Sequence, residues 1–188
     1  MGSKLSSSDK DVSVVMLGLD KAGKTTVLYK LKKQPTEGVE QTIGFNEEKV
    51  RYKRCQFGIY DVGGEQKIRS LWRHYISEVQ VVVFVVDSAD QERFPEARSE
   101  LLSLAAEMGR GQPLLVLANK QDVQGRLTVP DVQCRKSLNW KPSEIVPGTS
   151  WARVRSLGRD SMKPWPGSTP IMAHDVMRWL HSLPVDIS

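Results

Sequence analysis

The residues from 18 to 25 have the types and spacing of a phosphate-binding loop. They read Gly-Leu-Asp-Lys-Ala-Gly-Lys-Thr and fit G-x-x-x-x-G-K-[ST]. Backbone N–H groups and the start of a following helix attract phosphate in such a loop, because both carry partial positive charge. Lys24 is expected at the β- and γ-phosphates and the Thr25 hydroxyl at Mg²⁺. The candidate phosphate-binding residues are Gly18, Asp20, Lys21, Ala22, Gly23, Lys24, Thr25 and Thr26.

A second polar cluster, Asn119-Lys120-Gln121-Asp122, follows an apolar run and indicates guanine binding. The Asp122 carboxylate can accept hydrogen bonds from both the ring N–H and the amino group of guanine, a donor pair that adenine lacks. Asn119 can brace the base edge, and the stem of Lys120 can cover its face. A ligand-free glycine turn and a plain polar turn are the alternatives. The presence of both motifs in one chain disfavours them.

Two further segments offer ligands for a metal and for a γ-phosphate. Asp61-Val62-Gly63-Gly64 ends an expected strand, so Asp61 can hold the water shell of Mg²⁺ and the Gly64 N–H can meet a γ-phosphate oxygen. Thr42 lies in a polar loop, and its hydroxyl is expected to complete the Mg²⁺ site only when the γ-phosphate is present. Taken by itself, Thr42 would more often be an ordinary loop threonine, and only the segments around it favour the metal-binding role. The predicted cofactors are GTP or GDP with Mg²⁺.

The segments that position these residues alternate between strands and helices. Apolar, β-branched runs and a hairpin pattern with its turn near Arg54 and Cys55 predict strands over residues 12–17, 49–52, 56–61, 81–86 and 113–118. Helices are predicted over residues 24–33, from a cap at Asp90 to Met108, and between Met172 and Leu183. This alternation predicts an α/β fold: a mostly parallel sheet with one antiparallel hairpin and helices on both faces.

The length of 188 residues suits one domain. Residues 1–11 are expected to be a flexible N-terminal segment and residues 12–184 the folded domain. A short helix is expected within 129–138. Residues 141–170 are rich in proline and glycine and predict a divergent, loop-rich part around one short strand near 144–146.

Composition narrows the function classes. The net charge of +5 suits an acidic membrane surface or an acidic partner as well as a plain solvated surface. The sequence shows no basic repeat interleaved with aromatic residues, so nucleic-acid binding is not expected. The basic clusters are Lys30, Lys32 and Lys33; Lys49, Arg51, Lys53 and Arg54; and Lys67, Arg69, Arg73 and His74. The two cysteines suggest neither a metal site nor a disulfide framework, so a cytoplasmic location is expected. No signal peptide or run of transmembrane length is evident.

The N-terminal sequence Met1-Gly2-Ser3-Lys4-Leu5-Ser6 fits M-G-x-x-x-[ST] and predicts N-myristoylation of Gly2, with a disordered serine-rich start as the alternative. One myristoyl chain binds membranes only marginally, so peripheral and reversible contact with intracellular membranes is expected. Residues 185–188 contain no cysteine, which argues against prenylation.

The chain resembles the ADP-ribosylation factor-like (Arf/Arl) small GTPases from about residue 12 to residue 122. Asp20 inside the phosphate loop and the two glycines after Asp61 are typical of this family and not of Ras- or Rab-like proteins. The resemblance rests on Gly18-Leu19-Asp20, Thr42-Ile43-Gly44-Phe45-Asn46, Asp61-Val62-Gly63-Gly64, Lys67-Ile68-Arg69, Leu71-Trp72-Arg73-His74-Tyr75, Val85-Val86-Asp87-Ser88 and Ala118-Asn119-Lys120-Gln121-Asp122.

The resemblance implies the P-loop small GTPase fold and a monomeric switch in membrane trafficking. In the family, GTP and Mg²⁺ order the loops of Thr42 and Gly64, the hairpin between them shifts register, and the N-terminal segment is released. The implied partners are an exchange factor, an activating protein and effectors. The effector patch would map to Phe45, Tyr60 and Tyr75, where the family usually has Trp at the middle position; plain core packing is the alternative.

Two residues depart from the family pattern at the catalytic loops. Glu65 stands where the family places the Gln that orients the attacking water. A carboxylate cannot donate a hydrogen bond to the γ-phosphate, and its negative charge repels the adjacent polyanion. Weak GTP hydrolysis is therefore expected, with Gln66 a poor substitute. Gln41 replaces the family's Pro before Thr42 and predicts a looser loop. The catalytic candidates are thus Lys24 and, as a departure, Glu65.

The third guanine-contacting loop of the family has two candidate places here, near residues 149–152 or at 167–169. Three functions remain open. The leading one is an Arf-like switch with weak hydrolysis. A GTP-bound adaptor that does not hydrolyse is the alternative. A P-loop kinase or ATPase comes last, because it has no use for Asn119 and Asp122.

Overall fold

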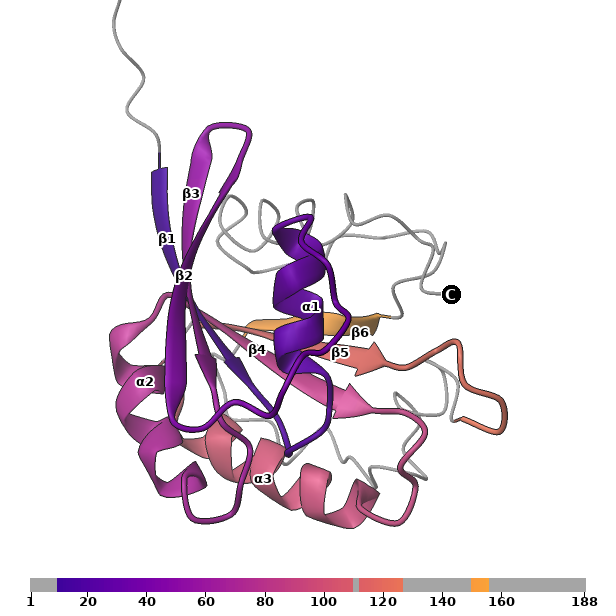
Figure 1. The fold of residues 1–188 in the computed structure, drawn as a ribbon. Coiled ribbons are helices and arrows are strands. Elements are labelled where there is room, and N and C mark those ends of the chain that lie inside the picture. Colours follow the sequence, from indigo (N-terminus) through magenta and orange to yellow (C-terminus); the bar gives the residue numbers. More distant parts are fainter. Residues whose placement is uncertain (1–9, 110–111, 127–149, 156–188) are drawn as a thin grey trace, which may run out of the picture.

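The computed structural model describes residues 10–109, 112–126 and 150–155 (Figure 1). A six-stranded sheet lies at the centre, in the order β2-β3-β1-β4-β5-β6. All neighbouring strands are parallel except the hairpin of β2 and β3 at one edge. The strands are β1 (Lys10–Leu17), β2 (Phe45–Tyr52), β3 (Cys55–Val62), β4 (Val81–Asp87), β5 (Pro113–Asn119) and β6 (Ser150–Arg155). The expected α/β fold with a mostly parallel sheet is confirmed.

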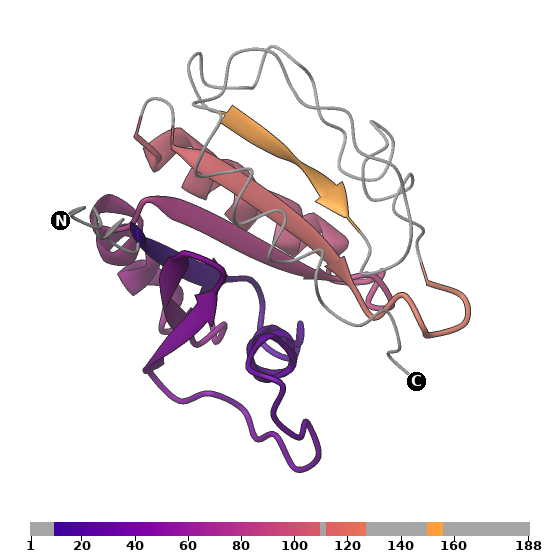
Figure 2. The ribbon, with the colours of Figure 1, turned by 90° about the horizontal axis from the view of Figure 1, so that it is seen from above.

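Helices cover both faces of the sheet (Figures 1 and 2). On one face, α1 (Lys24–Leu31) packs against alternate residues of β1 and β3. On the other face, α2 (Trp72–Glu78) and α3 (Phe94–Glu107) enclose the second core. The central strands β4 and β5 are buried on both faces, which explains their unbroken apolar sequences. No helix within the described ranges is long and apolar enough to cross a membrane.

Several element boundaries differ from those the sequence predicts. β1 begins at Lys10, so residues 10 and 11 belong to the sheet and not to the N-terminal segment. The hairpin turn lies at Lys53 and Arg54, and β2 extends back to Phe45 because its whole length pairs with β3. The short α2, preceded by a 3₁₀ turn at Arg69–Leu71, was not predicted.

Asp90 was expected to cap α3, but Arg93 precedes the first helical residue. The Asp90 carboxylate instead accepts hydrogen bonds from the backbone N–H and from Nε of Arg93, at 3.3 and 2.6 Å. Asp90 therefore stabilises the turn that leads into the helix.

β6 lies within the segment predicted as loop, although it forms a strand with β5. Ser150 pairs with Pro113, the first residue of β5, whereas Arg155 pairs with Leu117 near its end. The candidate guanine loop near 149–152 is therefore wrong, because residues 150–152 lie toward the opposite end of the sheet from Asn119. The second candidate at 167–169 lies outside the described residues, as do the expected helices within 129–138 and 172–183 and the strand at 144–146.

Candidate functional site

The carboxyl ends of β1, β3, β4 and β5 meet at one edge of the sheet, as parallel pairing requires. The phosphate loop follows β1, and the Gly63-Gly64 segment follows β3. Asn119 ends β5. Crevices at the carboxyl edge of an open α/β sheet are the usual ligand sites of such folds. The candidate residues of three separate motifs are thus brought together.

The phosphate loop is held in a shape that side chains would prevent. Gly18 has φ of 139°, and a Cβ there would lie 2.2 Å from the Val85 carbonyl oxygen. Gly23 has φ of 89° and directly precedes α1. Both conformations favour glycine, so the two fixed glycines of the motif have a structural cause.

Lys24 lies folded back over this loop. Its Nζ donates to the carbonyl oxygens of Gly18 and Leu19, at 2.9 and 3.0 Å. Burial lowers the pKa of Lys24 to about 8, although the negative charges of Asp61 and Asp20 oppose the shift. Among the described residues no carboxylate forms an ion pair with this buried ammonium group, so the group is well suited to receive phosphate oxygens.

The three predicted metal-binding side chains converge. Thr25 Oγ1 lies 2.7 Å from Thr42 Oγ1 and donates to Asp61 Oδ2 at 2.6 Å. Thr42 Oγ1 also lies 3.3 Å from the same carboxylate oxygen. Burial raises the pKa of Asp61, and hydrogen bonds from Thr25 and the charge of Lys24 oppose the rise.

The donor set fits Mg²⁺, which prefers hydroxyl, carboxylate and water oxygens. Asp61 Oδ1 is buried and has no hydrogen-bond partner among the described residues, so it leaves an acceptor free for a cation or its water. In the part of the chain that the structure describes, no group of three or more His, Cys, Asp or Glu side chains is placed so that it could hold a metal ion.

The guanine motif is tied to the phosphate loop. Asn119 Nδ2 donates to the Ala22 carbonyl at 2.8 Å, and Lys120 Nζ pairs with Asp87 Oδ2 at 2.6 Å. A Cβ at Gly23 would lie 2.3 Å from Asn119 Nδ2, so glycine there lets the two motifs touch. Asp122 is exposed, with its carboxylate available to a ligand.

A pocket of about 390 Å³ lies between the phosphate loop, the loop just before Thr42 and Lys120 of the guanine motif. It is lined by Lys21, Gly23, Lys24, Thr25, Thr26, Val39, Glu40, Gln41 and Lys120. Its size falls within the range of small-molecule sites, and its polar lining suits a charged ligand.

Two side chains fix the glycine segment after β3, and neither role was predicted from sequence. The indole N–H of Trp72 donates to the Gly63 carbonyl at 3.1 Å, and Arg69 Nε donates to the Gly64 carbonyl at 2.8 Å. Gly64 itself lies against the phosphate loop, since a Cβ there would lie 2.3 Å from Asp20 N. The predicted γ-phosphate contact of Gly64 is therefore placed beside the phosphate loop.

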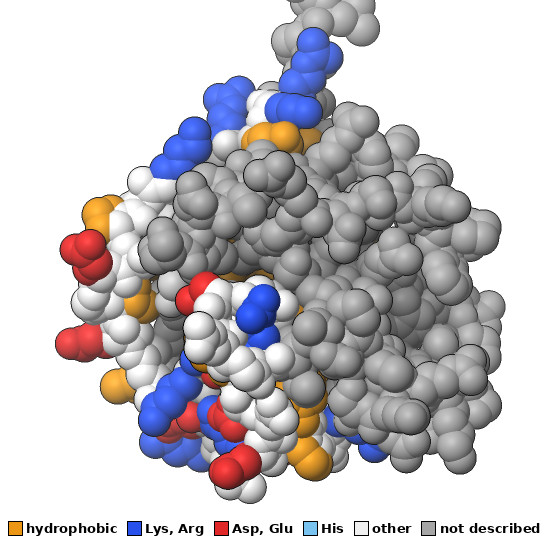
Figure 3. Space-filling view, turned by 90° about the vertical axis from the view of Figure 1, so that its right-hand side faces the viewer, with side chains coloured by type: hydrophobic (Ala, Val, Ile, Leu, Met, Phe, Trp, Pro, Cys, Tyr) orange, Lys and Arg blue, Asp and Glu red, His pale blue; other side chains and the backbone are white. Residues whose placement is uncertain are grey.

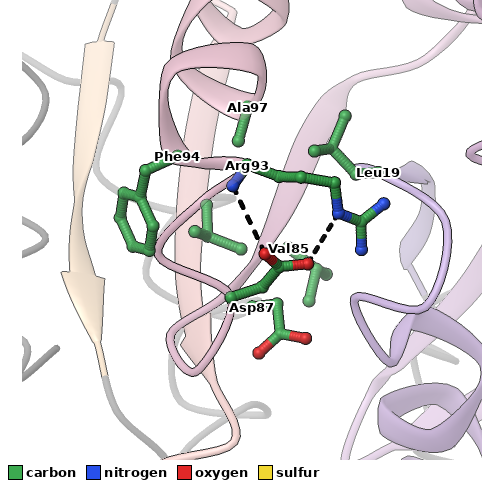
Figure 4. A pocket seen from close by; sticks show the side chains of 8 residues that line it. Leu19, Val85, Asp87, Arg93, Phe94 and Ala97 are labelled. Carbon is green, nitrogen blue, oxygen red and sulfur yellow. Dashed lines mark hydrogen bonds and ion pairs between the residues drawn. The ribbon is translucent and has the colours of Figure 1, made fainter. Parts of the chain in front are cut away.

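Asp20 links the phosphate loop to its neighbours. Arg93 Nη1 donates to Asp20 Oδ1 at 3.0 Å, and Arg69 Nη2 lies 3.8 Å from the same oxygen. Figure 4 shows the Arg93 side chain passing above Val85 toward Leu19. Arg69 is buried and also binds Glu96 and Glu100, at 2.7 and 3.0 Å. The Asp20 carboxylate of the phosphate loop thus interacts with two arginines, Arg69 from the 3₁₀ turn and Arg93 from the turn before α3.

The two departures from the family pattern contact each other. Glu65 Oε1 accepts a hydrogen bond from Gln41 Nε2 at 3.0 Å, and Glu65 Oε2 pairs with Lys67 Nζ at 2.9 Å. Gln41 was expected to loosen its loop, but it ties that loop to the segment after β3. Gln66, the weaker candidate, is exposed.

The predicted effector residues also lie together. The ring centroid of Tyr75 lies 5.6 Å from that of Phe45 and 5.9 Å from that of Tyr60. Phe45 is 53% exposed, and Ile43 is 86% exposed. Tyr60 and Tyr75, by contrast, are partly buried and pack against the core on that face of the sheet.

A scan against known families matches the ADP-ribosylation factor family model over residues 1–154. The chain belongs to the ADP-ribosylation factor family. A solved structure of the Arl6 BBS3 small GTPase from Trypanosoma brucei, with bound nucleotide analogue GppNp, is similar to this Arf-family chain, with a TM-score of 0.66 and 27% identity. The match covers 91% of this chain and 95% of that one. The chain is accordingly a GTP-binding switch with the small GTPase fold.

Gly2 lies outside the described residues, so its predicted myristoylation has no structural counterpart here. Among the residues missed from sequence, Trp72 and Arg69 belong to motifs that mark the family. Their roles become visible only in the folded chain, where each side chain donates a hydrogen bond to a backbone carbonyl of Gly63 or Gly64.

Proposed function

We propose that this Arf-family protein binds GTP or GDP with Mg²⁺, recruits effectors in its GTP state at intracellular membranes, and hydrolyses GTP slowly. The position of Thr42 is the observation that carries the proposal. Its hydroxyl lies 2.7 Å from that of Thr25 and beside Asp61, at the point where a metal bound to the γ-phosphate would be held. A loop that reaches this point distinguishes triphosphate from diphosphate.

Each part of the site has a separate task in this proposal. Mg²⁺, when bound, would neutralise charge on the β- and γ-phosphate oxygens, and Thr25, Thr42 and Asp61 would hold it. Lys24 would exchange its two carbonyl partners for phosphate oxygens. Asn119 holds the guanine motif against the phosphate loop, and Asp122 would select the base.

Slow hydrolysis follows from the position of Glu65. Both carboxylate oxygens are engaged, one by Gln41 and one by Lys67, and a carboxylate has no N–H to offer a γ-phosphate. The positioning of water by an amide side chain is therefore missing. This arrangement also favours the second candidate function, a GTP-bound adaptor that does not hydrolyse, over fast turnover.

Effector recruitment is supported by the aromatic cluster of Phe45, Tyr60 and Tyr75 between the two loops that would respond to γ-phosphate. Membrane contact is supported by the N-myristoylation pattern at Gly2. An exchange factor, an activating protein and effectors are the partners that the family implies.

Competition between nucleotides tests the proposal directly. GTP should displace a fluorescent GDP analogue from the purified protein, whereas ATP at the same concentration should not. Asp122→Asn should weaken GTP and strengthen xanthosine triphosphate, because the amide can donate to the carbonyl that replaces the guanine amino group. Glu92→Gln, at an exposed position before α3, is the matched carboxylate-to-amide control and should behave as the wild type. Equal displacement by ATP would refute guanine selection.

A further inference from the structure

Two loops meet at the end of the β2–β3 hairpin that lies near the phosphate loop. One precedes β2 and carries Thr42, and the other follows β3 and carries Gly64. The backbone pairing of the hairpin continues into these loops, because the N–H of Gly63 donates to the Gly44 carbonyl at 2.8 Å. The loops are also closely packed, since a Cβ at Gly63 would lie 3.0 Å from the Thr42 carbonyl oxygen. A movement of one loop therefore has to be accommodated by the other.

A hydrogen bond between side chains extends this contact. Gln41 Nε2 donates to Glu65 Oε1 at 3.0 Å, and we call this contact the interloop bond. Glu65 Oε2 pairs with Lys67 Nζ at 2.9 Å. The carboxyl edge of the sheet lies toward the bottom of Figures 1 and 3, and acidic and basic side chains lie next to one another on that part of the surface. The charge of Glu65 is likewise balanced within the chain, while its other oxygen holds Gln41.

Gln41 also borders the candidate nucleotide site. It lines the pocket that Lys24 and Thr25 line. The next residue, Thr42, places its hydroxyl 2.7 Å from that of Thr25. The amide of the interloop bond and the hydroxyl expected at the metal thus belong to neighbouring residues. A loop movement that withdrew Thr42 from the metal site would also carry Gln41 away from Glu65.

We propose that Gln41 determines how strongly this chain prefers GTP to GDP. The inference rests on the proposed contact of Thr42 with the metal of bound GTP. The interloop bond stabilises the closed arrangement, in which Thr42 lies beside Thr25, over an open one in which water hydrates the separated amide and carboxylate. The apparent affinity for a ligand scales with the fraction of protein in the arrangement that binds it. GTP uses the closed arrangement, whereas GDP has no γ-phosphate and needs no contact with Thr42, so the bond strengthens GTP binding selectively.

The chemistry of the two side chains explains why they act as a pair. An ionised Glu65 offers only acceptors, and Gln41 offers two N–H donors. A proline at position 41, as in the family pattern, has no side-chain donor. Removal of either side chain therefore leaves the other without its partner across the two loops.

Competition titrations against a fluorescent GDP analogue, on the full-length protein in excess Mg²⁺, test the proposal. The competitors are GDP and a non-hydrolysable GTP analogue, so that turnover does not enter. Gln41→Ala should weaken binding of the GTP analogue by about fivefold and leave GDP binding within about twofold of the wild type. Gln34→Ala, at an exposed glutamine of the same loop, is the matched control and should change neither affinity.

A double-mutant cycle isolates the interloop bond from the other effects of each side chain. In the background of Glu65→Ala, Gln41→Ala should weaken binding of the GTP analogue by less than about twofold, because the acceptor is already gone. Amide hydrogen exchange gives a second readout. Exchange in residues 36–44 should be faster in Gln41→Ala than in the wild type when the GTP analogue is bound, and unchanged when GDP is bound.

Three outcomes would overturn the proposal: wild-type binding of the GTP analogue by Gln41→Ala, an equal loss for GDP and the GTP analogue, or an undiminished loss in the Glu65→Ala background. Thr42→Ala distinguishes this inference from the proposed function. If Thr42→Ala weakens binding of the GTP analogue and Gln41→Ala does not, the Thr42 contact stands and the interloop bond has no role. If Thr42→Ala leaves that binding unchanged, the proposed metal contact fails and this inference fails with it.

Discussion

The side-chain amide of Gln41 donates a hydrogen bond of 3.0 Å to the carboxylate of Glu65. These two residues lie in separate loops, 24 positions apart, and both differ from the pattern of the Arf family. Lys67 binds the second oxygen of the same carboxylate at 2.9 Å. The loops on either side of the hairpin are thus joined by side chains of this chain, on the side where the family uses a glutamine to position water.

Glu65→Gln should increase the rate of GTP hydrolysis. The amide can donate toward the γ-phosphate and accept from water, and the repulsion between Glu65 and the phosphate disappears. We expect a rise of at least about tenfold in single-turnover hydrolysis by purified protein. Gln66→Ala, one residue further on, should leave the slow rate unchanged. Equal rates for wild type and Glu65→Gln would show that the carboxylate is not what limits hydrolysis.

Gly64→Ala should abolish the preference for GTP. The added Cβ would lie 2.3 Å from the backbone of Leu19 and Asp20, which cannot yield as a flexible side chain would. The segment after β3 must therefore move away from the phosphate loop, and the Gly64 N–H with it. The ratio of GTP to GDP affinity, from competition titrations, measures the effect. Gly58→Ala is the matched control, because a Cβ there meets nothing within 4 Å; a similar loss in that variant would contradict the interpretation.

The parts of this molecule that the sequence predicts are those set by local pattern. The strands β4 and β5 are continuous apolar runs because both faces are buried, and the phosphate loop is fixed by the positive φ of Gly23. The helix α2 has seven residues and no side-chain cap, so its boundaries carry no sequence signal, although Trp72, Ile76 and Val79 have helical spacing.

Contacts between segments that are far apart in the sequence could not be predicted from it. Proline and glycine around residues 150–155 favour a loop, and the strand β6 forms only because β5 offers an edge to pair with. The partnership of Gln41 with Glu65 likewise depends on how two loops approach each other, so residue type alone suggested a looser loop at Gln41.

Trp72→Phe should weaken GTP binding more than GDP binding. In a trans peptide the Gly63 carbonyl and the Gly64 N–H point in opposite directions, so the indole N–H that holds the carbonyl also directs the Gly64 N–H. Loss of this hydrogen bond should cost about 1–2 kcal/mol, or roughly 5- to 30-fold in GTP affinity.

A control separates this effect from loss of core packing. Phe84 forms an edge-to-face pair with Trp72, at 6.2 Å between ring centroids, and does not contact Gly63 through a hydrogen bond. Phe84→Leu should therefore lower the melting temperature without changing the ratio of GTP to GDP affinity. A changed ratio in Phe84→Leu would mean that packing, and not the indole N–H, sets the orientation of the peptide.

The affinity for GDP should fall as pH rises above about 8. Burial lowers the pKa of Lys24 to about 8 in the nucleotide-free protein, and bound phosphate raises that pKa because it stabilises the ammonium form. The favourable interaction is therefore complete below pH 8 and is lost above it, by up to about tenfold per pH unit until the pKa of the complex is reached. Titrations in excess EDTA exclude any contribution from Mg²⁺, and calorimetry in two buffers of different ionisation enthalpy should show proton uptake on binding. Lys24→Met should bind more weakly and retain only the titration of the guanine ring. The same pH dependence in Lys24→Met and wild type would assign the effect to another group.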